Sequence, residues 1–430
     1  MKTYIIAAVL TSLILLVSCS DTTNAIANRK EYQYNLELQN NTHTTYALNE
    51  IAFWKNKLKE SPHQISWIGR LASANTLAFS ATGIIDYLKE AESLLQEANE
   101  RTQFKNAGFL RAIARNYISQ HRFKEALQTL EKAVATQDDL TATHKMLFDV
   151  YLELGKDTLA KTTLETIKKE GDFDYYIRLA KWQDHKGKLQ EAIYTLEKAA
   201  RIATDANSKE LKIWTYSNLA DFYGHAGRIA DAYQHYLKTL QLDPHNAYAL
   251  KGIAWIAYAH DQNPEEALAI IDAILTKYSN PDLYVLKAEI ATTLGDKDLK
   301  EQAEQSYEKL ISKKGYGEMY NSYQILLLAD QPDKHARAMQ IAKREILNRA
   351  TPSSYDLLAW VYYQQGNITK AAAIVEQQVY QKTFEPEAMY HMAEIFKAAG
   401  QTNKVVTLKK ELQESYFELG PLLKVKIEKL

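Results

Sequence analysis

The stretch IWTYSNLADFYGHAGRIADAYQHYLKTLQLDP, residues 213–244, decides the fold of this chain. Counted from its first residue, the eighth and twentieth places hold Ala220 and Ala232, and tyrosines fill the fourth, eleventh and twenty-fourth. Gly227 at the fifteenth place suits the left-handed turn that ends a helix, and Pro244 at the thirty-second stops a second helix. The pattern therefore predicts two antiparallel helices whose backbones approach closely at the alanines.

The same pattern recurs along the chain, with 34 residues between three pairs of neighbouring starting points. The clear copies begin at Ala107, Thr141, Phe173, Ile213, Ala247, Pro352 and Pro386, and weaker copies begin near Gly69, Pro281 and Met319. This period and these residue types match the tetratricopeptide repeat. One such unit cannot bury its apolar face alone, so the units must stack. We predict an all-α fold, a right-handed α-solenoid of about ten helix-turn-helix repeats.

The N-terminus resembles that of a secreted lipoprotein. Lys2 precedes an apolar run, Tyr4–Val17, which is shorter than the roughly 20 residues that span a bilayer and suits a signal peptide. The run ends in Leu-Val-Ser-Cys, which resembles a bacterial lipobox, and Cys19 is the only cysteine in 430 residues. A lipid on Cys19 would tether the protein to a membrane surface without a spanning helix.

These features divide the chain into five predicted parts. They are a lipoprotein signal peptide (1–18), the lipidated cysteine with a flexible tether (19–31), an N-terminal helical cap (32–68), the repeat solenoid (69–413) and a C-terminal capping helix (414–430).

The lipobox and the repeats together resemble the tetratricopeptide-repeat lipoproteins of Bacteroidota envelopes. The stretches NYISQHRFKEA, DFDYYIRLAKWQDHKG and DFYGHAGRIADAYQHYLKTLQLDPHNAYALKGIAWIA, together with Cys19, carry this resemblance. It implies the fold, the lipid tether and a place in the cell envelope, anchored to the outer membrane on its periplasmic face or at the cell surface. It implies no activity.

Composition and motifs argue against nucleic-acid binding and catalysis. Without residues 1–18 the chain carries 51 basic and 53 acidic side chains, so no basic footprint for nucleic acid is present. Phosphate-binding, zinc-protease, serine-hydrolase and dinucleotide motifs are all absent from the sequence. We expect no enzyme, no cofactor and no metal.

Binding in the concave groove is the favoured function. In such a solenoid the first helix of each repeat lines the groove, and aromatic and charged side chains there suit a peptide segment. The predicted groove residues are Lys181, Asp184, His185, Trp214, Asp221, His225, Lys251, Trp255, Tyr258, Trp360 and Tyr363. Alternatively, some of the tryptophans pack between adjacent repeats.

His185 and His225 occupy the same place in neighbouring repeats, two residues before a glycine. Three interpretations stay open for them: a metal site completed by Asp184 and Asp221, a pH-sensitive contact with a partner, or capping of a helix C-terminus. Capping is favoured because a charged histidine there meets the negative end of the helix dipole.

The sequence thus predicts a monomeric, lipid-anchored adaptor that holds an envelope protein, or a peptide segment of one, in its groove. Two alternatives are a carrier of a small ligand or glycan enclosed by the superhelix and, less favoured, a hydrolase that uses the histidine–aspartate cluster.

Overall fold

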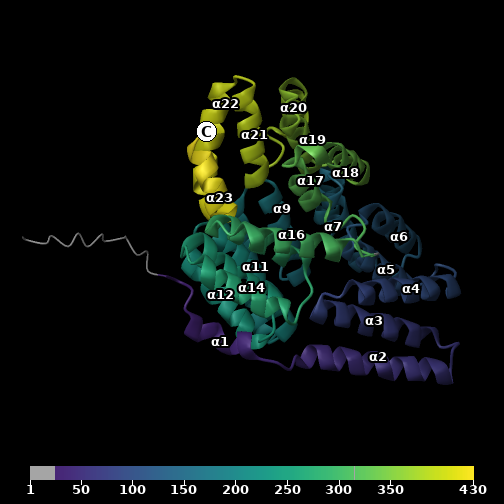
Figure 1. The fold of residues 1–430 in the computed structure, drawn as a ribbon. Coiled ribbons are helices and arrows are strands. Elements are labelled where there is room, and N and C mark those ends of the chain that lie inside the picture. Colours follow the sequence, from purple (N-terminus) through teal and green to yellow (C-terminus); the bar gives the residue numbers. More distant parts are fainter. Residues whose placement is uncertain (1–24, 314) are drawn as a thin grey trace, which may run out of the picture.

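The computed structural model describes residues 25–313 and 315–430, and this part of the chain contains helices and no β-strand (Figure 1). The signal peptide, Cys19 and the first residues of the tether lie outside the described residues. In the described part, no helix is both long enough and apolar enough to cross a bilayer.

In the described residues, ten antiparallel helix pairs follow one another, and we number them repeats 1 to 10. Repeats 1 to 5 are α3 (Ile65–Thr82) with α4 (Ile85–Arg101), α5 (Ala107–Ser119) with α6 (Phe123–Ala135), α7 (Leu140–Glu153) with α8 (Asp157–Thr166), α9 (Phe173–His185) with α10 (Leu189–Asp205), and α11 (Lys209–His225) with α12 (Ile229–Leu242). Repeats 6 to 10 are α13 (Ala247–Trp255) and the π-helical turn η1 (Ile256–His260) with α14 (Pro264–Leu275), α15 (Pro281–Leu294) with α16 (Lys297–Ile311), α17 (Asn321–Ala329) and the 3₁₀ turn η2 (Pro332–Lys334) with α18 (His335–Asn348), α19 (Pro352–Gln364) with α20 (Ile368–Ile374) and the π-helical turn η3 (Val375–Val379), and α21 (Pro386–Ala398) with α22 (Thr402–Glu414).

The packing follows the repeat pattern. Ala220 and Ala232, the small residues of repeat 5, are buried, and so are Tyr223 and Tyr236 beside them. Gly187 and Gly227, at the fifteenth place of their repeats, have φ of +70° and +71°, which is the left-handed conformation that glycine adopts without strain. The unusually long step between repeats 4 and 5 comes from two longer helices, α10 and α11.

The N-terminal part differs from the single cap expected over residues 32–68. Helix α2 (Thr42–Glu60) packs on α3, whereas α1 (Arg29–Glu37) lies against α12 and α14, far along the solenoid (Figure 1). The backbone N–H groups of Ile26 and Ala27 donate to Asp261 at 3.0 and 2.8 Å, so this end of the expected tether is fixed to the fold. The physical reason is that α1 has an apolar side of its own, with Tyr32 and Leu36 buried.

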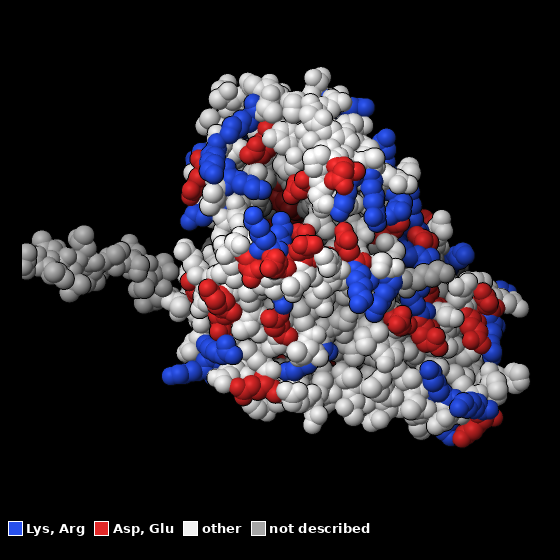
Figure 2. All heavy atoms as spheres, in the orientation of Figure 1, with Lys and Arg blue, Asp and Glu red and all other residues white. Residues whose placement is uncertain are grey.

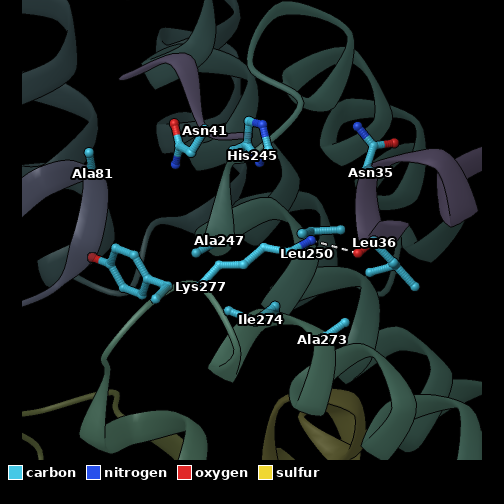
Figure 3. A pocket seen from close by; sticks show the side chains of 11 residues that line it. Asn35, Leu36, Asn41, Ala81, His245, Ala247, Leu250, Ala273, Ile274 and Lys277 are labelled. Atoms are coloured by element: carbon cyan, nitrogen blue, oxygen red, sulfur yellow. Dashed lines mark hydrogen bonds between the residues drawn. The ribbon is translucent and has the colours of Figure 1, made fainter. Parts of the chain in front are cut away.

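The link between α1 and α2 closes a small cavity against repeat 6 (Figure 3). The ammonium of Lys277 donates to the carbonyl oxygen of Leu36 at 2.6 Å, and His245 lies within 2.9 Å of the carbonyl oxygen of Asn40. The cavity has a volume of about 20 Å³, which is room for about one water molecule. It serves packing.

The solenoid curls until its successive turns touch. The N–H of Ser279, just before repeat 7, donates to the carbonyl oxygen of Thr82 in repeat 1 at 2.8 Å. Phe384, just before repeat 10, lies against Gly187 in repeat 4. Six repeats therefore separate the two partners in each contact, and the second turn touches the first at these places.

The C-terminal helix α23 (Tyr416–Glu428) completes the second turn. Its residues Leu419 and Ile427 are buried in the apolar cluster of repeat 10 with Leu408 and Leu412. The same helix also reaches across to α11, η1 and α15.

Candidate partner-binding site

A cleft opens where repeats 3 and 4 face the second turn. It has a volume of about 770 Å³, and its walls come from α7 to α9, from the α18–α19 link and from the segment before α21. We call it the inter-turn cleft, and its charged lining residues are Glu153, Asp157, Lys181, Asp184, His185, Lys186, Arg349, Lys382 and Glu385. A volume of this size lies in the range of known ligand sites.

The cations of the inter-turn cleft are mostly paired with acids. Lys181 lies 3.3 Å from Glu153, and Arg349 reaches the same carboxylate at 3.3 Å. His185 and Lys186 both contact Asp157. Burial opposes the ionisation of Asp157, but its hydrogen bonds with Lys186 and His185 hold its pKa below the usual value.

The acids that remain are Asp184 and Glu385. Neither has an ion-pair partner within residues 25–313 and 315–430. Limited solvation between the two turns raises the pKa of Asp184, and it raises that of Glu385 together with the nearby charge of Asp184. Lys382, whose ammonium donates to the carbonyl oxygen of Gln377, is likewise without an ion pair in the described residues, so the cleft offers both acidic and basic side chains to a ligand. Figure 2 shows that basic and acidic side chains are intermixed over one face, with acidic ones in a hollow beside the C-terminal helices.

A second cavity, of about 340 Å³, lies next along the inner face, on α11 and α13. We call it the Phe417 pocket, and it is lined by Ala220, Asp221, Gly224, His225, Ala232, Tyr236, Tyr248, Lys251, Gly252, Trp255, Phe417 and Glu418. Asp221 accepts hydrogen bonds from the hydroxyls of Tyr236 and Tyr248, while burial raises the pKa of its carboxyl group. Lys251 lies 3.8 Å from Asp282.

Both histidines end their helices: α9 stops at His185 and α11 at His225. The acids within 4.0 Å of them are not Asp184 and Asp221, the aspartates named in the metal-site interpretation. His185 Nε2 lies 3.1 Å from Asp157 Oδ1, and His225 Nε2 lies 4.0 Å from Glu418 Oε1. Among the residues that the structure describes, no group of three or more histidine, cysteine, aspartate or glutamate side chains is arranged to hold a metal.

Seven of the eleven predicted groove residues line these two cavities. Lys181, Asp184 and His185 line the inter-turn cleft, and Asp221, His225, Lys251 and Trp255 line the Phe417 pocket.

The other four predicted residues lie elsewhere. Tyr258 is 1% exposed and hydrogen-bonds Thr293 at 2.7 Å, so it belongs to the core. Trp360 is 7% exposed and stacks on His391 of the next repeat with ring centroids 4.1 Å apart. Tyr363 is half-buried beside Trp360, and Trp214 is 39% exposed.

The burial of Tyr258 and Trp360 has two different causes. The π-helical turn η1 holds Tyr258. Its extra residue rotates the following side chains by about 100° relative to a regular helix. Trp360 is covered because α19 and α21 pack together, which is the packing between adjacent repeats that the sequence left open.

Several residues that line the two cavities come from the second turn, and the sequence did not predict them. Arg349, Glu385, Phe417 and Glu418 stand in links or in α23, outside the signature places of any repeat. The only sequence signal near them is the Gly420–Pro421 pair, which marks a break in the last helix.

Comparisons with known proteins found repeat models and solved structures similar to this chain. Tetratricopeptide-repeat models match residues 225–290 and 352–377. Similar solved structures include a human IFIT1 dimer with m7Gppp-AAAA (16% identity, 76% of each chain covered, TM-score 0.46). They also include Pseudomonas aeruginosa PilF (15% identity, 50% of this chain and 97% of that one, TM-score 0.37).

A further similar structure is YrrB, described as a tetratricopeptide-repeat protein with an unusual peptide-binding site (18% identity, 46% of this chain and 95% of that one, TM-score 0.28). No curated protein matches the chain. The chain is an all-α solenoid of tetratricopeptide repeats, a fold that is typically a protein-binding scaffold.

Proposed function

We propose that this protein is a lipid-anchored envelope adaptor, acting as a monomer, that holds a segment of another protein along the inter-turn cleft and the Phe417 pocket. The observation that carries the proposal is the inter-turn cleft itself, about 770 Å³ of open space lined by the inner-face residues Lys181, Asp184 and His185.

Charge supports a particular kind of segment. Lys181, Lys186 and Arg349 are engaged by Glu153 and Asp157, whereas Asp184 and Glu385 have no ion-pair partner in the described part of the chain. A lysine or arginine of the bound segment would supply that charge and fix its register.

The lipid anchor and the outer-membrane location rest on the lipobox at Cys19 and on the resemblance to envelope lipoproteins. A tether at this end would leave the inner face of repeats 3 to 6 available to another envelope protein.

The volume of the inter-turn cleft also suits the alternative of a small-ligand carrier. The geometry supports a hydrolase less well. In the described residues, the side chain of His185 is hydrogen-bonded to an aspartate, Asp157, and to no serine, threonine or cysteine. We therefore propose a binding protein.

Site-specific photo-crosslinking in living cells tests this function. A photoreactive amino acid replaces either Lys181, in the cleft, or Tyr194, which is 58% exposed on the second helix of the same repeat. We expect the Lys181 position to label one defined segment of a partner and the Tyr194 position to label none. Equal labelling from both positions would count against the site.

The double variant Asp184→Asn/Glu385→Gln gives the electrostatic control. It removes the two unpaired charges while keeping side-chain size, so crosslinking from position 181 should fall severalfold. Unchanged crosslinking would show that these carboxylates do not set the register.

A further inference from the structure

The chain is fixed to its own solenoid a few residues after the predicted lipid anchor. The carboxylate of Asp261, whose side chain is 2% exposed, accepts the backbone N–H groups of Ile26 and Ala27 at 3.0 and 2.8 Å. The backbone N–H of Asn28 donates to the hydroxyl of Tyr233 at 3.0 Å. Hydrogen bonds to an ionised carboxylate are among the stronger ones, so this end of the chain is held firmly at repeats 5 and 6.

Helix α1 continues the attachment. Tyr32 and Leu36 are buried in the same apolar cluster as residues of α12 and α14. The guanidinium of Arg29 and the hydroxyl of Tyr32 both donate to Glu266 of α14, at 2.8 and 2.9 Å. We call residues 26–36 the N-terminal strap. These contacts make the strap part of the core that it covers, so the strap and repeats 5 and 6 move together.

The predicted lipid site stays within a short reach of the strap. Six residues separate Cys19 from Ile26. Since an extended chain spans at most about 3.6 Å per residue, the Cα atoms of Cys19 and Ile26 are at most about 25 Å apart. A bilayer that holds a lipid on Cys19 therefore lies close to repeats 5 and 6. The link between α4 and α5 lies on the far side of the solenoid from the strap (Figure 1).

The outer side of α1 has side chains that suit a membrane interface. Tyr34 is 69% exposed, and Lys30, one helical turn before it, is exposed and makes no salt bridge among the described residues. Residues four apart lie on the same side of a helix. Tyrosine and lysine both favour the headgroup region, where their apolar parts are covered and their polar ends stay in water. Glu37 shares this side, so the contact depends on these two side chains and not on a net positive charge.

We propose that the N-terminal strap fixes the orientation of the solenoid on the membrane. The side of α1 that carries Lys30 and Tyr34 lies in the headgroup region of the bilayer, and the opposite side holds repeats 5 and 6 next to it. A lipid on a free tether would attach the protein to the membrane without orienting it. This inference rests on the lipid anchor of the proposed function and adds a membrane-contacting surface to it.

The test uses the acylated full chain on vesicles of phosphatidylethanolamine and phosphatidylglycerol that contain a lipid with a spin-labelled headgroup. Cys19 is the only cysteine and would carry the lipid, so an introduced cysteine can be labelled alone with a fluorophore. The two positions are Gln262, exposed beside Asp261, and Phe104, 42% exposed in the link between α4 and α5. Because the spin label quenches fluorophores near the membrane surface, we expect severalfold stronger quenching in Gln262→Cys than in Phe104→Cys.

A surface variant tests the contact made by α1. Lys30→Gln/Tyr34→Gln removes the two outer side chains and keeps the buried contacts of the strap, so the chain should stay bound while the difference between positions 262 and 104 shrinks. Tyr194→Gln/Lys198→Gln is the matched control. These residues form another tyrosine–lysine pair four residues apart, on α10, with Tyr194 58% exposed and the ammonium 4.4 Å from its ring centroid. The control should leave the difference unchanged.

Equal quenching from the two positions, or stronger quenching from position 104, would overturn the proposal. An unchanged difference in the Lys30→Gln/Tyr34→Gln chain, or an equal loss in the control, would also overturn it. Flotation of the vesicles separates this failure from that of the proposed function. A chain that floats with equal quenching keeps its lipid anchor and loses the orientation, whereas an acylated chain that does not float loses both.

Discussion

Trp255 and Phe417 are 162 residues apart in the sequence, and the indole N–H of Trp255 donates a 3.0 Å hydrogen bond to the carbonyl oxygen of Phe417. This bond joins repeat 6 to the C-terminal helix and places the two turns of the solenoid against each other.

Replacing Trp255 with phenylalanine removes the donor and keeps an aromatic ring. We expect the free energy of unfolding to fall by about 1 kcal/mol, the usual net contribution of one hydrogen bond. Denaturant titration followed by circular dichroism measures it. Trp214→Phe is the matched control, since Trp214 is 39% exposed, and it should change stability by less than about 0.5 kcal/mol.

Gly187 and Gly227 stand at the same place of neighbouring repeats. Comparing their substitution by alanine distinguishes the cost of backbone strain from the cost of disturbing a contact between the turns. Gly187 and Gly227 have φ of +70° and +71°, but an added Cβ meets the ring of Phe384 at 2.8 Å at Gly187 and nothing within 4 Å at Gly227. Gly227→Ala should cost about 1–2 kcal/mol for the left-handed backbone alone. Gly187→Ala should cost about 1–3 kcal/mol more, because the ring must move. Equal losses in thermal unfolding would show that the turns do not pack tightly here.

Arg349 ties the α18–α19 link to the first turn. Its guanidinium lies 3.3 Å from Glu153 and 2.5 Å from Glu345, whose side chain is 3% exposed. Arg349→Ala leaves a buried carboxylate without its cation, so stability should fall by about 2–3 kcal/mol. Arg344→Ala breaks a more exposed pair with Glu318 and should cost less than about 1 kcal/mol. Similar losses from the two variants would argue against the role of Arg349 between the turns.

Glu289 on α15 makes the folded state sensitive to pH. Burial, with a contribution from the charge of Glu387, raises the pKa of Glu289 from 4.5 to about 7, although the hydroxyl of Tyr258 opposes the rise. Because the folded state then binds the proton more tightly than the unfolded state, the contribution of Glu289 to stability falls as pH rises from about 4.5 to about 7.

Glu289→Gln should therefore stabilise the chain at pH 8 by on the order of 1–3 kcal/mol and have little effect at pH 4.5. Unfolding titrations of both proteins across this range provide the check. The same gain at both pH values would mean that ionisation of Glu289 is not its cause.

Cys19→Ser tests the predicted lipid anchor. The variant should lose incorporation of a labelled fatty acid and move from the membrane fraction to the soluble fraction, because the acyl chains are the expected source of membrane affinity. Retention of the variant in washed membranes would exclude lipidation as the anchor.

The repeat architecture was predictable because its cause is local. Alanines at the eighth and twentieth places recur with the period of one helix pair, and each pair contacts its neighbours in the same way. Thus Ala220 and Ala232 identified the packing of repeat 5, and the glycines identified the turns.

The site was predictable only in part, for a related reason. The positions of Asp184, His185 and Lys251 on first helices follow from the repeat pattern, and these residues line the two cavities. The partners of these residues, such as Glu385 and Phe417, depend on how far the superhelix curls, and no periodicity within one repeat encodes that. Tyr258 was predicted to face the groove but lies in the core. The prediction assumed a regular helix, and the π-helical turn η1 interrupts that helix at Tyr258.

The touching turns have a consequence for how the chain folds and unfolds. In an open solenoid each repeat contacts only its neighbours, and unfolding can begin at an end and spread one repeat at a time. Here Arg349 and Glu153 are paired across 196 residues, and Trp255 and Phe417 across 162. Loss of a terminal repeat would also remove contacts of a repeat in the middle, so we expect the chain to lose its structure in one cooperative transition. Contacts between residues so far apart in the sequence must form late in folding. We therefore expect the chain to fold slowly as well as cooperatively.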